Sequence, residues 1–316
     1  MKIITFDDIK ALNIDPVECY RWVDEMLRDK DSVHLPPKIS MKQQGGIFCN
    51  VMPCIVPNVD GGREGVKLVT RYPSRVPALD ARILLMDSNT GEFMALMDGT
   101  WITGIRTGAV AAHTIMTLAK KDFTVMGFMG LGNTARATML ILANLIKERE
   151  ITVKLLRYKD QAESFAERFK EYQNFKFVIV DTPEEMIKGS EVVVSAVTVL
   201  KENVCANECF DEGVLVVPIH TMGFINCDTY FDKIYGDDYG HICHFGDFND
   251  FPNFAEVADV LAGRAPGREN DKERILAYNI GLSIHDIFYA SKIYDMLKDK
   301  DLPEVELDEP AEKFWV

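Results

Sequence analysis

The 316-residue chain has no run near the roughly 20 uninterrupted apolar residues that a membrane-spanning helix needs. Its opening, MKIITFDDIK, lacks the apolar stretch and small-residue cleavage site of a signal peptide. Basic residues are few: 35 Lys and Arg stand against 49 Asp and Glu, a net charge of −14. That field opposes polyanions such as nucleic acid. Seven scattered cysteines, an odd number, indicate reduced thiols. These absences predict a cytoplasmic protein whose partners include neither nucleic acid nor a membrane.

The length allows two domains of roughly 100–200 residues each. Up to about residue 113 the sequence is predicted to be β-rich after an opening helix. The strand-like segments are GIFCNVMPCIV, GVKLVTRYP, ARILLMD and EFMALMDG, the last preceded by a hairpin turn at Asp87–Gly91. Apolar residues at a period near 3.6 then predict a helix from about Thr100 to Lys120.

From Thr124 onward, strand-like and helix-like segments alternate. The predicted strands are Thr124–Met129, Ile151–Leu156, Phe175–Val180, Glu191–Val197 and Gly213–Ile219. Nearly continuous apolar strands separated by helices imply a parallel sheet covered on both faces. We expect a loop from Asp237 to about Pro252, a helix in FAEVADVLAGR, and a long helix from about Lys272 to Leu297. The fold class is therefore α/β with a Rossmann-type domain.

A glycine-rich turn follows the first of these strands. Gly130, Gly132 and Ala135 have the G-x-G-x-x-A spacing of a dinucleotide-binding turn, and an amphipathic helix begins there. The glycines permit a tight turn and close approach to pyrophosphate, which then binds at the helix N-terminus. A purely structural turn is the alternative, but the strand–turn–helix context favours a cofactor.

The strand after this turn lacks the expected acid. A carboxylate there would bind the ribose 2′-hydroxyl of NAD, whereas Arg157 and Lys159 offer positive charge to a 2′-phosphate. Asp160 lies close enough in sequence to contact a ribose, and the two cations could simply be solvated. We expect NADP(H) to be favoured over NAD(H).

Four segments resemble the ornithine cyclodeaminase/μ-crystallin family. They are GVKLVTRYP (65–73), MDSNTGEFMALMDGTWITGIRTGAVAA (86–112), MGFMGLGNTARATM (126–139) and AGRAPGRENDKERILAYNIGLSIHDIFYASKIYD (262–295). The resemblance implies a homodimer in which a Rossmann-type nucleotide-binding domain is inserted in a β-rich substrate and dimerisation domain. The implied bounds are 114–282 for the former, and 1–113 plus 283–316 for the latter.

The resemblance also implies NAD(P)-dependent redox chemistry at the Cα–N bond of a small amino or imino acid. Family activities of the ornithine cyclodeaminase, ketimine reductase and alanine dehydrogenase types all stay open. So does a different class, a catalytically inactive, NADP(H)-gated binding protein of the μ-crystallin type.

Several residues match the family's functional positions. Lys67 and Arg106 match the pair that holds the substrate carboxylate, and Lys67 is also a candidate for proton transfer. Lys38 falls where the family often has an arginine. The remaining matches are candidate cofactor-binding residues: Asn133, Thr134 and Arg136 in the glycine loop, Thr198 near the nicotinamide half, and Asn279 in place of a common serine.

Two residues depart from the cyclodeaminase pattern. Asn50 replaces the glutamate that receives the substrate's side-chain amine, and His220 replaces the acid/base aspartate. Histidine can still move a proton near neutral pH. Losing both carboxylates puts ornithine in doubt and favours a monoamine or an imino acid. No metal is expected, because the spacing of His241, Cys243 and His244 matches no zinc signature.

Overall fold

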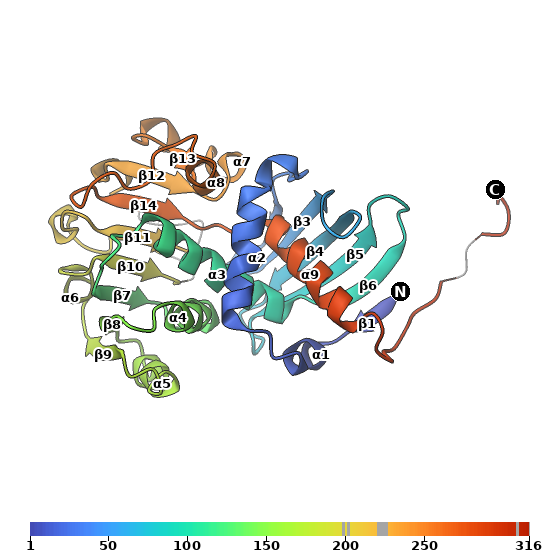
Figure 1. The fold of residues 1–316 in the computed structure, drawn as a ribbon, viewed down its shortest axis with the longest axis horizontal. Coiled ribbons are helices and arrows are strands. Elements are labelled where there is room, and N and C mark those ends of the chain that lie inside the picture. The colour runs from blue at the N-terminus through green and yellow to red at the C-terminus, as the bar shows by residue number, and fades with distance from the viewer. Residues whose placement is uncertain (198–199, 201–202, 220–226, 308–309, 316) are drawn as a thin grey trace.

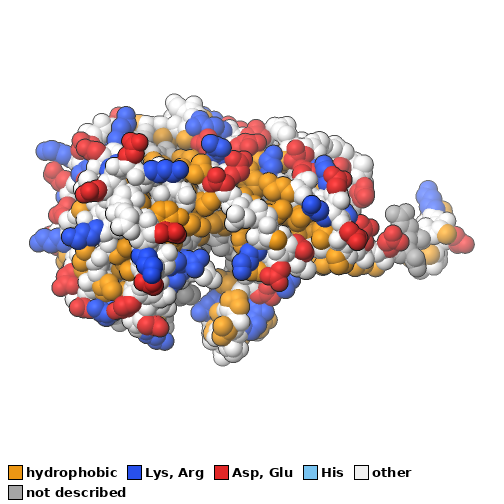
Figure 2. Space-filling view, turned by 60° about the horizontal axis from the view of Figure 1, so that its bottom comes forward, with side chains coloured by type: hydrophobic (Ala, Val, Ile, Leu, Met, Phe, Trp, Pro, Cys, Tyr) orange, Lys and Arg blue, Asp and Glu red, His pale blue; other side chains and the backbone are white. Residues whose placement is uncertain are grey.

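The computed structural model describes the chain except for residues 198–199, 201–202, 220–226, 308–309 and 316. Two β-sheets lie side by side, and helices α2, α3 and α9 lie between and in front of them (Figure 1). The C-terminal segment projects away from the body (Figures 1 and 2). Among the described residues, no helix has both the length and the apolar content to cross a bilayer.

The first sheet has six strands in the order β1-β6-β5-β4-β3-β2. Its strands are β1 (Lys2–Ile4), β2 (Ile39–Lys42), β3 (Phe48–Val56), β4 (Arg63–Arg71), β5 (Leu79–Asp87) and β6 (Phe93–Asp98). All pairs are antiparallel except β1 with β6. The predicted hairpin joins β5 to β6, and the Asp87 carboxylate accepts from the backbone N–H groups of Asn89 and Thr90. The β-rich N-terminal region is thus confirmed.

The second sheet has eight strands in the order β13-β12-β14-β11-β10-β7-β8-β9, all paired in parallel. Its strands are β7 (Val125–Met129), β8 (Ile151–Leu156), β9 (Phe175–Val180), β10 (Val192–Ser195), β11 (Leu215–Pro218), β12 (Lys233–Gly236), β13 (Ala255–Glu256) and β14 (Ile275–Tyr278). The chain crosses from one side of β7 to the other between β9 and β10. This switch point is where doubly wound sheets bind ligands.

The helices are α1 (Phe6–Ala11), α2 (Pro16–Arg28), α3 (Thr100–Leu118), α4 (Asn133–Leu145), α5 (Gln161–Arg168), α6 (Pro183–Ile187), α7 (Tyr239–Ile242), α8 (Val257–Leu261) and α9 (Ser283–Leu297). Single 3-10 turns lie at Lys30–Ser32, Gln44–Gly46, Asn207–Cys209, Asp228–Tyr230 and Phe248–Asp250. Local sequence explains the starts of the first two helices. Thr5 and Asp8 form a capping box at α1. At α2, Asp15 caps the helix by accepting from the Val17 N–H, and Pro16 is the first helical residue.

One predicted element is wrong. The long helix expected from Lys272 to Leu297 is a strand followed by a shorter helix, because Ile275–Tyr278 forms the buried strand β14. A short apolar run cannot be told from a buried helix segment by periodicity alone. Gly281, with φ +86°, then interrupts the regular structure before α9 begins at Ser283. The expected loop after Asp237 also contains the one-turn helix α7.

Helix α9 covers one face of the six-stranded sheet. It crosses in front of β3 and β4 (Figure 1), and a Cβ on Gly65 of β4 would come within 2.8 Å of the Ile287 side chain. One hydrophobic cluster runs from Trp22 of α2 through Ile287 to Phe128 of the parallel sheet. The two sheets therefore share a core. The division into 1–113 plus 283–316 and 114–282 stays a prediction.

Candidate active site

The predicted dinucleotide turn lies at the switch point of the parallel sheet. Gly130 directly follows β7 with φ +76°, and a Cβ there would lie 2.5 Å from the backbone of Ala196 and Val197, just beyond β10. Glycine is therefore required, because any side chain would collide with backbone. Gly132 differs: it is exposed, and a Cβ there would meet nothing within 4 Å. Open space thus faces the start of α4.

The rest of the turn suits an anion. Helix α4 begins at Asn133 with no side-chain cap, so its first N–H groups point into that space. Ala135 is buried beneath the turn, where its small side chain lets the helix approach the sheet. Arg136 donates to the Leu131 carbonyl at 3.2 Å and to the Ser164 hydroxyl at 3.1 Å, which fixes it beside the loop. These residues fit a pyrophosphate group.

Arg157 and Lys159 follow the carboxyl end of β8, as predicted. Arg157 donates from Nε to Asp181 at 2.7 Å and pairs with Glu163 as well. Lys159 has φ +53°, and its ammonium lies 5.3 Å from the Tyr158 ring centroid. The Arg157 charge is therefore already shared with two exposed carboxylates.

The two predicted carboxylate-binding cations meet at one acid. Lys67 lies on β4, Arg106 on α3 and Asp286 on α9. The Lys67 Nζ lies 2.5 Å from Asp286 Oδ2, and Arg106 Nε donates to Asp286 Oδ1 at 2.8 Å. The Lys67 and Asp286 side chains are fully buried and that of Arg106 is 5% exposed. The structure thus brings together residues far apart in the sequence.

Burial changes the chemistry of this cluster. Loss of solvent, reinforced by the Arg106 charge, lowers the pKa of Lys67 to about 7, although Asp286 opposes the shift. Lys67 and Asp286 form a buried ion pair, and Arg106 Nη1 is buried with no hydrogen-bond partner among the described residues. The cluster therefore holds donor groups for an anion and a lysine able to exchange a proton near neutral pH.

Lys38 approaches the same region from the segment before β2. Its ammonium donates to the Ile280 carbonyl at 2.9 Å, next to Gly281. A Cβ on Gly281 would lie 2.7 Å from Arg106 Nη1, so the Lys38 and Arg106 side chains both reach this linker. Burial lowers the pKa of Lys38, while burial raises that of Asp237, which accepts from the Gly281 N–H at 2.8 Å.

Two neutral amides present unpartnered oxygens. Asn50 lies on β3, two residues from Met52, which pairs with Lys67, so alternation places Asn50 and Lys67 on the same sheet face. Its Oδ1 is buried and has no hydrogen-bond partner in the part of the chain that the structure describes. Asn279, just after β14, donates to the Thr114 hydroxyl at 3.1 Å, and its own Oδ1 is likewise buried and unpartnered. Both oxygens could accept from a bound ligand.

Thr198 and His220 lie outside the described residues, so their predicted roles stay predictions. Sequence reasoning missed Asp286 and Gly281. The signal for Asp286 was a carboxylate within the apolar stretch SIHDIFYA, since buried acids are rare unless paired. His241, considered as a metal ligand, instead accepts from the Lys38 N–H at 3.2 Å and bonds to Asp238.

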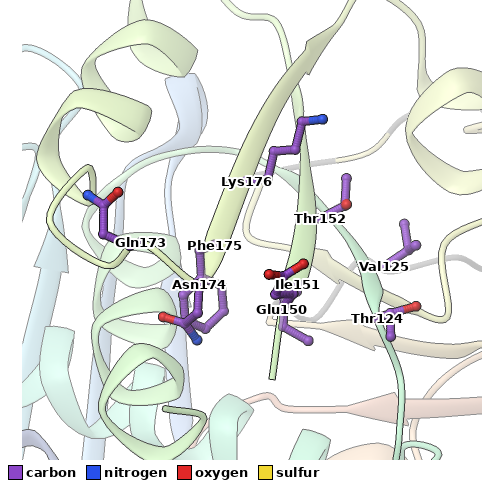
Figure 3. Close-up of a pocket in the computed structure, with 9 residues that line it drawn as sticks. All are labelled: Thr124, Val125, Glu150, Ile151, Thr152, Gln173, Asn174, Phe175 and Lys176. Atoms are coloured by element: carbon purple, nitrogen blue, oxygen red, sulfur yellow. The ribbon is translucent and has the colours of Figure 1, made fainter. Parts of the chain in front are cut away.

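A separate hollow of about 640 Å³ lies at the amino ends of strands in the parallel sheet (Figure 3). It is lined by Thr124, Val125, Glu150, Ile151, Thr152, Gln173, Asn174, Phe175 and Lys176. These residues surround the amino ends of β7, β8 and β9, whereas Gly130 follows the carboxyl end of β7. The hollow is therefore distinct from the predicted cofactor turn.

The sheet order and the glycine turn define an α/β protein with a Rossmann-type domain. An alanine dehydrogenase of Archaeoglobus fulgidus is 26% identical, with 95% of this chain and 96% of the relative aligned. The Thermococcus litoralis Δ1-pyrroline-2-carboxylate reductase, solved with NADH and L-proline, has a TM-score of 0.84 and 23% identity, covering 96% of this chain and all of that one. An archaeal alanine dehydrogenase dimer with bound NAD has a TM-score of 0.83 and 24% identity, covering 98% and 99%.

The family model of the ornithine cyclodeaminase/mu-crystallin family matches residues 3–301. This chain belongs to that family, which confirms the resemblance drawn from the four sequence segments. The structural neighbours confirm the α/β, Rossmann-type fold class.

Proposed function

We propose that this protein is an NAD(P)-dependent oxidoreductase acting at the Cα–N bond of a small amino or imino acid. The observation that carries the proposal is the buried pair of Lys67 and Arg106, with Arg106 Nη1 left unpartnered. Support comes from relatives named for alanine dehydrogenase and pyrroline-2-carboxylate reductase activity. Family membership supports it as well.

Helix packing ties the two halves of the proposed site together. A Cβ on Gly108 of α3 would lie 2.5 Å from the Ala137 side chain of α4, so the two helices are in close contact there. Arg106 lies half a turn before this crossing, and α4 begins one turn before Ala137. A carboxylate on Arg106 would therefore be held at a set position relative to a dinucleotide on α4.

Each residue has a proposed role. Arg106 and Lys67 hold the α-carboxylate and so orient Cα, while Lys38 adds positive charge. A nicotinamide cofactor supplies hydride exchange at Cα when it is bound. Lys67, with its pKa near 7, and His220 are the groups proposed to move the proton on the amine or imine nitrogen. Asn50 contributes no charge, which favours a substrate without a second ammonium group.

The cofactor proposed is NADP(H) in preference to NAD(H). Arg157 stands at the end of β8, where a 2′-phosphate would arrive, and residues 156–159 of the chain include no Asp or Glu. Its present partners, Asp181 and Glu163, are exposed, so exchanging them for a phosphate costs little.

A homodimer is also proposed. The face of the six-stranded sheet away from α9 carries exposed apolar side chains, among them Ile39, Leu68 and Phe93, which are 61%, 43% and 54% exposed. A second copy of the chain on the sheet face would bury these residues.

The second candidate is a nucleotide-gated binding protein without turnover. Two departures favour it: Asn50 stands where cyclodeaminases have a glutamate that receives the substrate's amine, and His220 stands where they have the acid/base aspartate. Incubation with amino acids plus NADP⁺, and with cyclic imines or 2-oxo acids plus ammonia and NADPH, separates the two. A change in nicotinamide absorbance that is lost in Lys67→Ala supports the enzyme. Saturable cofactor binding with no turnover on any amine or imine contradicts the enzyme and supports the binding protein.

A further inference from the structure

We propose that Asp286 is a positioning residue that holds Lys67 and Arg106 in place for the substrate carboxylate. This inference rests on the proposed function, because it concerns the same site. Its basis is geometric: one carboxylate uses one oxygen for each cation, Oδ2 for Lys67 at 2.5 Å and Oδ1 for Arg106 at 2.8 Å.

The acid itself is firmly placed. Asp286 lies in the first turn of α9, which the Ser283 hydroxyl ties to the sheet by donating to the Pro53 carbonyl at 2.7 Å. One turn after Ser283, Ile287 packs against β4 at Gly65, where the glycine has no side chain. The Asp286 carboxylate therefore cannot follow a displaced cation, and the cations align to it.

Asp286 also sets the charge of the cluster. With Lys67 and Arg106 protonated, the three side chains sum to one positive charge, which matches one carboxylate. Without Asp286, two like charges would face each other in a dry site, where isolated charges are unfavourable. Lys67 would then lose its proton more readily, since the Asp286 charge is what opposes the lowering of its pKa.

Neighbouring groups affect the protonation of Lys67. Among the described residues, the charged groups that face Lys67 are Arg106 from α3, Asp286 from α9 and Lys38 from the segment before β2. His285 on α9 is buried, and burial holds its pKa well below the ordinary value, so it is neutral. Cys54 on β3 lies near Asp286, and burial raises its pKa to about 12, so it stays a thiol. Among the described residues of this cluster, Lys67 is therefore the group expected to titrate near neutrality.

The experiment measures binding of pyrrole-2-carboxylate, a planar ring carboxylate that a nicotinamide cannot reduce. Calorimetry across neutral pH compares the full-length wild type with Asp286→Asn and Asp286→Glu. Asp24→Asn is the control, because it removes a carboxylate that contacts the buried His113 ring at 2.9 Å and none of the three cluster residues. With NADP⁺ present, we expect wild-type affinity to fall as Lys67 deprotonates.

In Asp286→Asn the midpoint of that fall should move to lower pH by about one unit or more, with affinity at neutral pH about tenfold weaker. Asp286→Glu keeps the charge, so its midpoint should stay, but its longer side chain displaces both cations and weakens binding severalfold. Asp24→Asn should bind as the wild type does. A purely structural aspartate would not shift the midpoint.

Wild-type affinity and midpoint in Asp286→Asn would overturn the inference. If Asp286→Asn fails to fold, Asp286→Glu provides the test. Wild-type affinity for the probe in Asp286→Glu would then overturn the inference. A wild type that binds no probe also overturns the inference. The outcome is separable from the proposed function: pH-dependent probe binding without turnover contradicts the oxidoreductase alone, whereas turnover with an unshifted Asp286→Asn midpoint contradicts only the role of Asp286.

Discussion

Gly281 lies so close to Arg106 that a Cβ on the glycine would stand 2.7 Å from Nη1 and 3.3 Å from Nη2. The glycine also has φ +86°, a conformation that side chains rarely adopt. The linker between β14 and α9 therefore provides the space in which the guanidinium lies.

Replacing this glycine should displace Arg106. In Gly281→Ala we expect KM for the amino or imino acid to rise about tenfold or more, and the free energy of unfolding to fall by about 1–3 kcal/mol. Gly263→Ala is the matched control, since Gly263 also has a positive φ of +71° but nothing within 4 Å. It should lose stability and keep KM. Steady-state kinetics and urea unfolding measure both, and equal KM values would contradict the packing argument.

Gly132 tests whether the open space at α4 receives the cofactor. Its φ of −79° suits alanine, and a Cβ would meet no atom of the described residues within 4 Å, so Gly132→Ala should change the free energy of unfolding by less than about 0.5 kcal/mol. A pyrophosphate in that space would clash with the new methyl group. We expect cofactor affinity, measured by nucleotide fluorescence, to fall about tenfold or more. Undiminished binding would show that the dinucleotide lies elsewhere.

Gly130→Ala should behave differently. There the methyl group would press on the Ala196 and Val197 backbone, so the fold itself should lose stability along with cofactor binding. Comparing the two alanine variants separates the glycine needed by the chain from the one needed by the ligand.

Arg157 tests the cofactor preference. If its guanidinium binds a 2′-phosphate, Arg157→Ala should weaken NADPH by about tenfold and NADH far less. Asp181→Asn removes one of its present partners and should strengthen NADPH relative to NADH. Dissociation constants for both nucleotides provide the measurement. Equal losses in Arg157→Ala would end the NADP(H) proposal.

Lys67 should give the protein a distinctive pH dependence. Its pKa falls from an ordinary 10.5 to about 7 in the folded state. Between these values the unfolded chain binds one proton more than the folded chain, so the free energy of unfolding should rise with pH. Lys67→Met lacks this contribution to the pH dependence, because methionine does not titrate. Urea unfolding at several pH values should show the wild type gaining on the variant from neutral to alkaline pH; parallel curves would contradict the lowered pKa.

The exposed sheet face tests the proposed dimer. Leu68→Glu puts a charge where a second copy would pack, so sedimentation should show a shift from dimer to monomer. Met116→Glu is the control, since Met116 on α3 is similarly exposed, at 41% against 43% for Leu68. A dimer that survives Leu68→Glu would place the interface elsewhere.

Local sequence was sufficient for much of the parallel sheet. Ile151–Leu156 and Phe175–Val180 are strands with the predicted bounds, because continuous apolar runs flanked by helical periodicity have few alternatives. The spacing of Gly130 and Gly132 predicted the turn, and the backbone itself requires glycine at Gly130, where φ is +76° and a Cβ would collide with backbone. The helix from Thr100 was also predicted, and it ends two residues early, at Leu118.

Other features depended on contacts between distant segments. Ile275–Tyr278 is a strand because it fills a place between β11 and β12, which its own four apolar residues do not specify. Arg106 and Asp286 are 180 residues apart and became partners only when α3 and α9 packed together. Hydrophobic pattern and glycine positions act within a few residues and can be read along the chain. The partner, burial and proton affinity of a charged group are set by whatever the fold brings around it.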